Sequence, residues 1–289
     1  MENTIQIGRG DLKATVAKPG THYARARFDW TGFIPQVTYR GKSFCVSEEG
    51  PLKLKSTGGE GLNNEFKADD ASRGWEDDRY FLKPGVGLLE KVDDKPYFFF
   101  TEYPIAQPFP CEMEVRDDTV TFRLGALPHN GIAYTMDKHI AVVGNELLIT
   151  TTLRNIGEKP LNISEYNHNF LSLDGAGARP GVTQTVNSDY NDSSNVEELE
   201  KNTDHIAFTA VPTKFFMITC NAPVAYAPMR WEMRDEKTGL RVQEWGDFDV
   251  TKFLIWGGAH VISPEIFGDF SAQPGQSRTW TRMWRFFAS

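Results

Sequence analysis

Apolar and polar residues alternate with a period of two along most of this chain. Residues 146–154 read Glu-Leu-Leu-Ile-Thr-Thr-Thr-Leu-Arg and are rich in β-branched side chains. Near the C-terminus, Trp280, Arg282, Trp284 and Phe286 occupy every second position. Successive side chains of a β-strand point to opposite faces, so this period predicts strands and not helices.

Turn residues separate the predicted strands. Gly144-Asn145 lies between the apolar segments 138–143 and 146–154. Asp117-Asp118 lies between segments 111–116 and 119–124. A short Gly- or Asp-containing turn flanked by alternating segments is typical of a β-hairpin, so we predict a hairpin at both places.

Other signals in the chain are few. A capping-box match at Ser194-Asn-Val-Glu197, followed by residues 198–201, predicts one short surface helix. Residues 56–79 and 175–204 are rich in Gly, Asn, Asp and Ser, which predicts two long loops. Many short strands joined by turns indicate an all-β fold, a large antiparallel β-sandwich, formed by residues 1–289 as a single domain.

Composition excludes several classes of partner. The chain has a formal net charge of −8 and no cluster of Lys and Arg, which argues against nucleic acid and anionic membrane surfaces as partners. The N-terminus shows no signal-peptide pattern, and three cysteines without CxxC spacing favour reduced thiols, so we expect a cytoplasmic protein. Aromatic residues make up 12% of the chain and are suited to packing on sugar rings.

The segment Glu165-Tyr-Asn-His-Asn-Phe170 is the first candidate site. As a strand it places Tyr166, His168 and Phe170 on one face and Asn167 on the other. Imidazole gains or loses a proton near neutral pH, so His168 is a candidate for proton transfer to a ligand oxygen. A core histidine bonded to a backbone carbonyl is the alternative.

Glu265 is the second candidate. It follows Pro264 after the apolar segment 252–256, at the predicted end of a strand. Burial there would raise the pKa of its carboxyl group toward the range of a general base, whereas a solvated turn glutamate would keep an ordinary pKa.

Further polar residues could bind a ligand. Arg27 alternates with aromatic residues in segment 25–30, Lys83 lies in a loop-like segment, and Lys138 and Arg241 lie on predicted strands. A guanidinium group can bind neighbouring hydroxyls or a phosphate, although most such residues form surface pairs. Asn64 and Glu65, followed by Phe66, could line the rim of a site in the first predicted loop.

The order of these segments resembles the aldose 1-epimerase (galactose mutarotase-like) superfamily. The resemblance spans nearly the whole chain and rests on these segments: Tyr23-Ala-Arg-Ala-Arg27-Phe-Asp-Trp-Thr-Gly32, Tyr39-Arg-Gly-Lys-Ser-Phe44, Asn155-Ile-Gly157, Asn167-His168-Asn-Phe170, Pro264-Glu265, Pro274-Gly275 and Trp284-Arg-Phe286. It implies a large twisted antiparallel β-sandwich and an enzyme that interconverts the anomers of a small sugar.

The resemblance also implies residue roles. His168 would be the general acid that protonates the ring oxygen, and Glu265 the general base that deprotonates the anomeric hydroxyl, without a cofactor or a metal. Substrate would be bound by a set of polar residues: Arg27, Asn64, Glu65, Lys83, Asn167 and Arg241. The second histidine that typical members carry in a glycine-flanked motif is missing, and Asn64-Glu65-Phe66 stands in that region. A sugar-phosphate epimerase and a non-catalytic carbohydrate-binding β-sandwich are the alternatives.

Overall fold

The chain folds into stacked antiparallel sheets in a computed structural model that describes residues 3–52, 56–75, 79–187, 190–191, 196–202, 205–220 and 229–288. Within these ranges the regular elements are strands and one four-residue helix, α1 (Asp70–Arg73). The predicted all-β class is therefore confirmed. None of the helical residues in the described ranges forms a segment long and apolar enough to cross a membrane.

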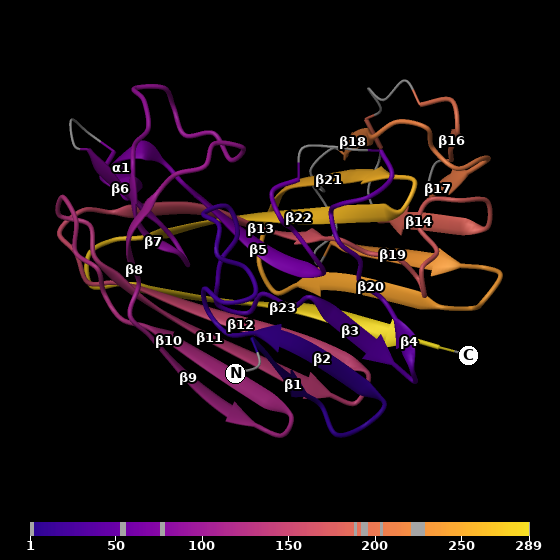
Figure 1. Cartoon of the computed structure of the whole chain (residues 1–289), viewed down its shortest axis with the longest axis horizontal. Helices are drawn as coiled ribbons and strands as arrows, with labels where there is room; N and C mark the ends of the chain where they lie inside the picture. Colours follow the sequence, from indigo (N-terminus) through magenta and orange to yellow (C-terminus); the bar gives the residue numbers. More distant parts are fainter. Residues whose placement is uncertain are drawn as a thin grey trace.

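The largest sheet has ten strands and runs the length of the molecule (Figure 1). In spatial order it contains β16 (Leu199–Lys201), β17 (His205–Phe208), β14 (Val182–Val186), β19 (Arg230–Asp235), β20 (Arg241–Gly246), β23 (Ser277–Phe287), β12 (Glu146–Asn155), β11 (Tyr134–Val143), β10 (Thr119–Leu124) and β9 (Cys111–Arg116).

A six-stranded sheet packs over the ten-stranded one (Figure 1). Its spatial order is β15 (Tyr190–Asn191), β18 (Phe216–Cys220), β21 (Val250–Gly258), β22 (Val261–Ala272), β13 (Leu161–Asn169) and β5 (Leu62–Ala68). The described residues also form two small sheets. One contains β1 (Thr4–Ile7), β2 (Leu12–Ala17), β3 (Gln36–Tyr39) and β4 (Lys42–Ser43), and the other contains β6 (Tyr80–Lys83), β7 (Gly87–Glu90) and β8 (Ile105–Pro108).

Both predicted hairpins are present. Strands β11 and β12 pair from Val143↔Glu146 outward, and Gly144 adopts a φ of 62°, which the turn requires and which glycine tolerates well. Strands β9 and β10 pair through Arg116↔Thr119. Short-range alternation and turn chemistry were therefore sufficient to place these strands.

Two predicted loops and the predicted helix were wrong. Segment 56–79 contains β5 and α1, and segment 175–204 contains β14, β15 and β16. The cap residue Ser194 lies outside the described residues, but residues 199–201, predicted as helix, form β16 and pair with β17. These segments carry many polar residues, and their strands form because they pair with strands that are distant in the sequence.

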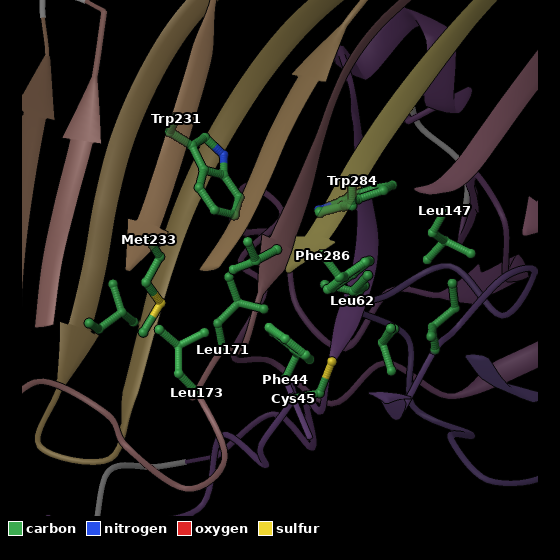
Figure 2. Packing of buried hydrophobic residues seen from close by; sticks show 14 of the residues in the cluster. Phe44, Cys45, Leu62, Leu147, Leu171, Leu173, Trp231, Met233, Trp284 and Phe286 are labelled. Carbon is green, nitrogen blue, oxygen red and sulfur yellow. The ribbon is translucent and has the colours of Figure 1, made fainter. Parts of the chain in front are cut away.

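The main hydrophobic core fills the space between the sheets. Figure 2 shows Phe44 and Leu62 from the first quarter of the chain close to Trp284 and Phe286 from its last strand. The Phe44 and Phe286 rings meet edge to face with centroids 5.0 Å apart. Packing of this kind joins the two ends of the sequence.

A buried polar layer also joins the two large sheets. On β23, Arg282 forms ion pairs of 2.7 Å with Glu165 on β13 and of 2.8 Å with Glu244 on β20. The indole N–H of Trp284 donates to Oδ1 of Asn169 over 3.2 Å. These bonds satisfy buried charges and hold the inner face of β13 against the ten-stranded sheet.

Candidate functional site

The two faces of β13 have different surroundings. Glu165, Asn167 and Asn169 point toward the ten-stranded sheet, where Glu165 and Asn169 have the partners described above. Tyr166 and His168 point the other way, and the His168 ring stacks on Phe170 with centroids 4.0 Å apart and planes 8° apart. The predicted alternation is confirmed, and it defines an outer face of the six-stranded sheet that carries the candidate residues.

His168, Ser263 and Glu265 form a connected group on this face. Nδ1 of His168 lies 2.8 Å from Oγ of Ser263, and that hydroxyl lies 3.1 Å from Oε1 of Glu265. Nε2 of His168 lies 3.4 Å from the same Oε1 atom. Because one hydroxyl proton cannot be donated to both neighbours, the proton positions of the three side chains are linked.

Local strand geometry creates room for this group. The continuous pairing of β13 with β22 ends at Tyr166↔Phe267. Beyond that point the backbone N–H of Asn169 donates to the Ser263 hydroxyl over 3.0 Å, in place of a ladder bond. Glu265, predicted at the end of a strand, instead lies inside β22, one residue after Pro264.

Burial sets the charge of both titratable groups. His168 is 5% exposed and Glu265 is 4% exposed. Desolvation lowers the pKa of His168 well below its usual value, and the positive charges of Arg27 and Lys67 lower it further. Desolvation raises the pKa of Glu265 to about 8, although Arg27 and the Ser263 hydroxyl oppose the shift. Near neutral pH the imidazole is therefore unprotonated and the carboxyl group is largely protonated.

Arg27 organises a second group next to the first. Its Nε donates to Glu65 over 2.7 Å, and its two terminal nitrogens donate to Thr57 over 2.9 Å and to the Tyr166 hydroxyl over 3.2 Å. The Tyr166 hydroxyl also donates to Glu65. Burial alone would raise the pKa of Glu65, but Arg27 and Lys83 hold it below its usual range.

Lys83 lies beside this second group at the end of β6. Its ammonium donates to the backbone carbonyl of Phe66 over 2.6 Å and lies 5.1 Å from the centre of the Tyr97 ring. Complete burial lowers its pKa to about 7, an effect that the nearby charge of Glu65 opposes. Lys83 is thus adjacent to Glu65, as a partly charged amine.

A cleft of about 330 Å³ opens next to Arg27. Its walls include Arg25, Arg27, Thr57, Phe99 and Tyr103. The Phe99 ring lies over the Arg27 guanidinium at 4.3 Å, so an aromatic side chain covers this end of the site. Monosaccharide-sized ligands suit clefts that combine an aromatic wall with a few polar groups.

Three predicted binding residues do not reach this face. Asn64 points inward, where it donates to Glu165 and accepts from Lys138 over 2.7 Å. Asn167 also points inward and donates to Asn169 over 2.7 Å. Arg241 lies on β20, where its guanidinium is 3.6 Å from Glu232 and 4.2 Å from the centre of the Phe287 ring.

Five of the predicted site residues therefore lie close together on or beside the outer face of the six-stranded sheet: Arg27, Glu65, Lys83, His168 and Glu265. The other three do not lie on this face. Among the residues that the structure describes, no group of three or more His, Cys, Asp or Glu side chains could hold a metal ion.

Comparison with solved structures identifies the fold. The Slr1438 protein of Synechocystis sp. PCC 6803 aligns over 99% of this chain and 96% of its own, with a TM-score of 0.62 and 12% identity. An aldose epimerase homologue from C. elegans aligns over 99% and 98%, with a TM-score of 0.61 and 11% identity. A galactose mutarotase-like protein from Lactobacillus casei ATCC 334 aligns over 98% and 100%, with a TM-score of 0.60 and 11% identity.

The chain has the galactose mutarotase-like fold. The predicted resemblance is confirmed at the level of the fold, and at these identities the sequence has diverged strongly. No protein-family model matches the sequence, and no curated protein is significantly similar to it.

Sequence reasoning missed three residues of this candidate site. Ser263, which links the imidazole to the carboxyl group, stands two residues before Glu265 and thus faces the same side of β22. Tyr166 shares a face with His168 by the same rule. That period-two relationship was the available signal for both residues. Thr57 had no such signal, because it lies in a segment without regular alternation.

Proposed function

We propose that this galactose mutarotase-like protein interconverts the anomers of an aldose by general acid–base catalysis. The observation that supports the proposal best is the buried His168–Ser263–Glu265 group, in which a proton donor and a proton acceptor lie side by side. Ring opening of a hemiacetal needs both functions at once, one at the ring oxygen and one at the anomeric hydroxyl.

The charge states suggest how the two protons move. Glu265, neutral because burial raises its pKa to about 8, gives its proton to the ring oxygen. His168, neutral because burial lowers its pKa, takes the proton of the anomeric hydroxyl. The bond from the anomeric carbon to the ring oxygen breaks and the carbonyl forms. Rotation about the adjacent carbon–carbon bond and the reverse transfers close the other anomer and restore both neutral groups.

This assignment reverses the roles that the family resemblance implies, in which His168 is the acid. It also fits the short separation of the two groups. Both oxygens of a hemiacetal are bonded to the same carbon, so a donor and an acceptor that lie close together can serve both from one side of the sugar.

Arg27 and Tyr166 are the proposed binding groups for sugar hydroxyls. The Arg27 guanidinium lines the cleft and donates to the Tyr166 hydroxyl, and the Tyr166 ring lies 6.2 Å from the His168 ring between centroids. Both groups are hydrogen-bonded to Glu65. Because His168 and Glu265 are almost completely covered, a sugar reaches them only when covering side chains move aside, among them Phe28, whose ring meets the His168 ring edge to face with centroids 6.0 Å apart.

Sugar binding without turnover is the second candidate function. One observation favours it: His168 and Glu265 are 5% and 4% exposed, whereas Arg27 lines an open cleft. A protein that only binds sugar needs the cleft beside Arg27 but does not need the pair to contact the anomeric centre.

Exchange NMR and polarimetry on a panel of free aldoses test the proposal. Wild-type protein should accelerate anomer exchange of at least one aldose. His168→Asn and Glu265→Gln should each reduce the enzyme-dependent rate by roughly 10²–10⁴-fold. His139→Asn, which alters an exposed histidine on β11, and Glu232→Gln on β19 are the controls and should retain wild-type rates.

If no aldose exchanges faster than in buffer, catalysis is rejected. An NMR titration of the same panel then decides the second candidate, because chemical-shift changes confined to residues around Arg27 support binding without turnover.

A further inference from the structure

Asn63 is a fully buried amide without a hydrogen-bond partner in the described part of the chain. Its exposure is 0%, and neither Oδ1 nor Nδ2 has a partner among the residues that the structure describes. The next two residues of β5 are bonded, Asn64 to Lys138 and Glu65 to Arg27. Buried side-chain amides are nearly always hydrogen-bonded in folded proteins, so an amide with both ends unpaired requires an explanation.

The strand register places this amide beside the acid–base pair. Strands β5 and β13 are antiparallel neighbours (Figure 1), and Asn63 pairs directly with His168. Directly opposed residues project from the same face of a sheet, with Cβ atoms roughly 4.5–5.5 Å apart. The next pair on this face, Glu65↔Tyr166, is joined by a side-chain hydrogen bond. Asn63 therefore lies on the outer face, adjacent to the His168 ring.

One more buried polar atom on this face of β5 has no partner among the described residues. It is Oε1 of Glu65, two residues along the strand from Asn63. An amide offers two donors and an acceptor, and a carboxylate offers acceptors only. Together they match sugar hydroxyls, each of which can donate one hydrogen bond and accept others.

We propose that Asn63 is a sugar-binding residue of this site, and that its amide binds the hydroxyl on the carbon next to the anomeric carbon. This inference rests on the proposed function. In the strand order β22-β13-β5, Glu265 and Asn63 lie on opposite sides of His168. With Glu265 at the ring oxygen and His168 at the anomeric hydroxyl, Asn63 faces the ring carbon on the other side of the anomeric carbon. Asn63 determines specificity in this proposal: it favours aldoses with a 2-hydroxyl over 2-deoxy aldoses.

Kinetics of Asn63→Leu on paired substrates test this role. Leucine has a similar volume and removes both polar ends of the side chain. With the preferred aldose, KM should rise about tenfold while kcat changes much less, as expected for the loss of one or two hydrogen bonds. With the 2-deoxy aldose, wild type and variant should have the same KM within twofold. Equal KM values for wild type and variant on the preferred aldose would overturn the inference.

Thermal unfolding without sugar gives an independent measurement. If the amide is unpaired in the free protein, Asn63→Leu should unfold at the same temperature as wild type or a higher one. A large drop in the unfolding temperature would show that an internal water satisfies the amide, and the ligand-binding role would be rejected. Tyr134→Phe is the matched control, because it removes another unpaired buried oxygen, on β11 next to Phe109, and should leave KM unchanged.

Failure of the proposed function is distinguishable from failure of this inference. If wild type binds an aldose in an NMR titration but does not interconvert its anomers, the catalytic proposal falls, and weaker binding by Asn63→Leu still supports the Asn63 assignment. If wild type catalyses exchange and the variant is indistinguishable from it, only the Asn63 assignment falls. If wild type neither binds nor converts any aldose, both are overturned.

Discussion

Nε2 of His168 on β13 lies 3.4 Å from Oε1 of Glu265 on β22, although the two residues are far apart in the sequence. Burial favours the neutral form of each group and thus a protonated carboxyl beside an unprotonated imidazole. The pair is therefore poised to give and take protons without carrying net charge.

Removing the Ser263 hydroxyl should change the pH dependence of activity. The hydrogen bond from Ser263 lowers the pKa of Glu265, so Ser263→Ala should raise that pKa above its value of about 8. If Glu265 acts in its protonated form, the alkaline limb of the kcat profile should move to higher pH, and kcat should fall about tenfold. Ser271→Ala, an exposed serine on the same strand, is the control. An alkaline limb that stays in place would exclude Glu265 as the acid.

Glu265 should make stability depend on pH in a defined direction. Its pKa is about 8 in the folded protein and 4.5 as an ordinary side chain. Between these values the folded state binds the proton and the unfolded state does not, so the free energy of unfolding falls as pH rises through this window. Glu265→Gln cannot lose this proton, so the variant does not lose this part of the free energy of unfolding as pH rises. Unfolding temperatures of variant and wild type should be similar near about pH 4 and diverge in favour of the variant toward about pH 9.

Glu244, whose pKa burial raises to about 7, contributes in the same direction, but it is present in both proteins and cancels in the difference. Parallel curves for wild type and Glu265→Gln across the whole range would show that the Glu265 carboxyl does not titrate in this window.

Truncating Arg27 should destabilise the fold as well as the site. Its guanidinium compensates the buried charge of Glu65, so Arg27→Ala should lower the free energy of unfolding by about 3–5 kcal/mol. Adding Glu65→Gln removes the uncompensated charge and should recover part of that loss. Denaturant titrations measure the free energies of unfolding of the single and the double variant. The control is Arg40→Ala at an exposed ion pair, which should leave the free energy of unfolding unchanged. A double variant no more stable than the single one would contradict this account.

Arg241 should be dispensable for sugar turnover or binding. It lies beside Glu232 and Phe287 and not with the residues around Arg27. Arg241→Ala should therefore keep KM within about twofold of wild type, whereas Arg27→Lys, which loses the forked set of donors, should raise it at least about tenfold. A large KM increase for Arg241→Ala would mean that the substrate extends beyond the cleft beside Arg27.

The sequence by itself determined the strand class, both hairpins and the faces of β13. Each depends on neighbours within a few residues: period-two alternation separates His168 from Asn167, and Gly144 supplies the turn conformation. The order of short segments along the chain also indicated the galactose mutarotase-like fold, because that order follows the order of the strands.

Only the tertiary structure decided which polar residues meet. Strand β5 was predicted as a loop because Asn63, Asn64 and Glu65 are polar, yet two of them are paired with residues from distant segments and all three are buried. Glu265 was predicted at a strand end and lies within β22. Whether a polar side chain can be buried depends on partners supplied by other parts of the chain, and local sequence does not encode those partners.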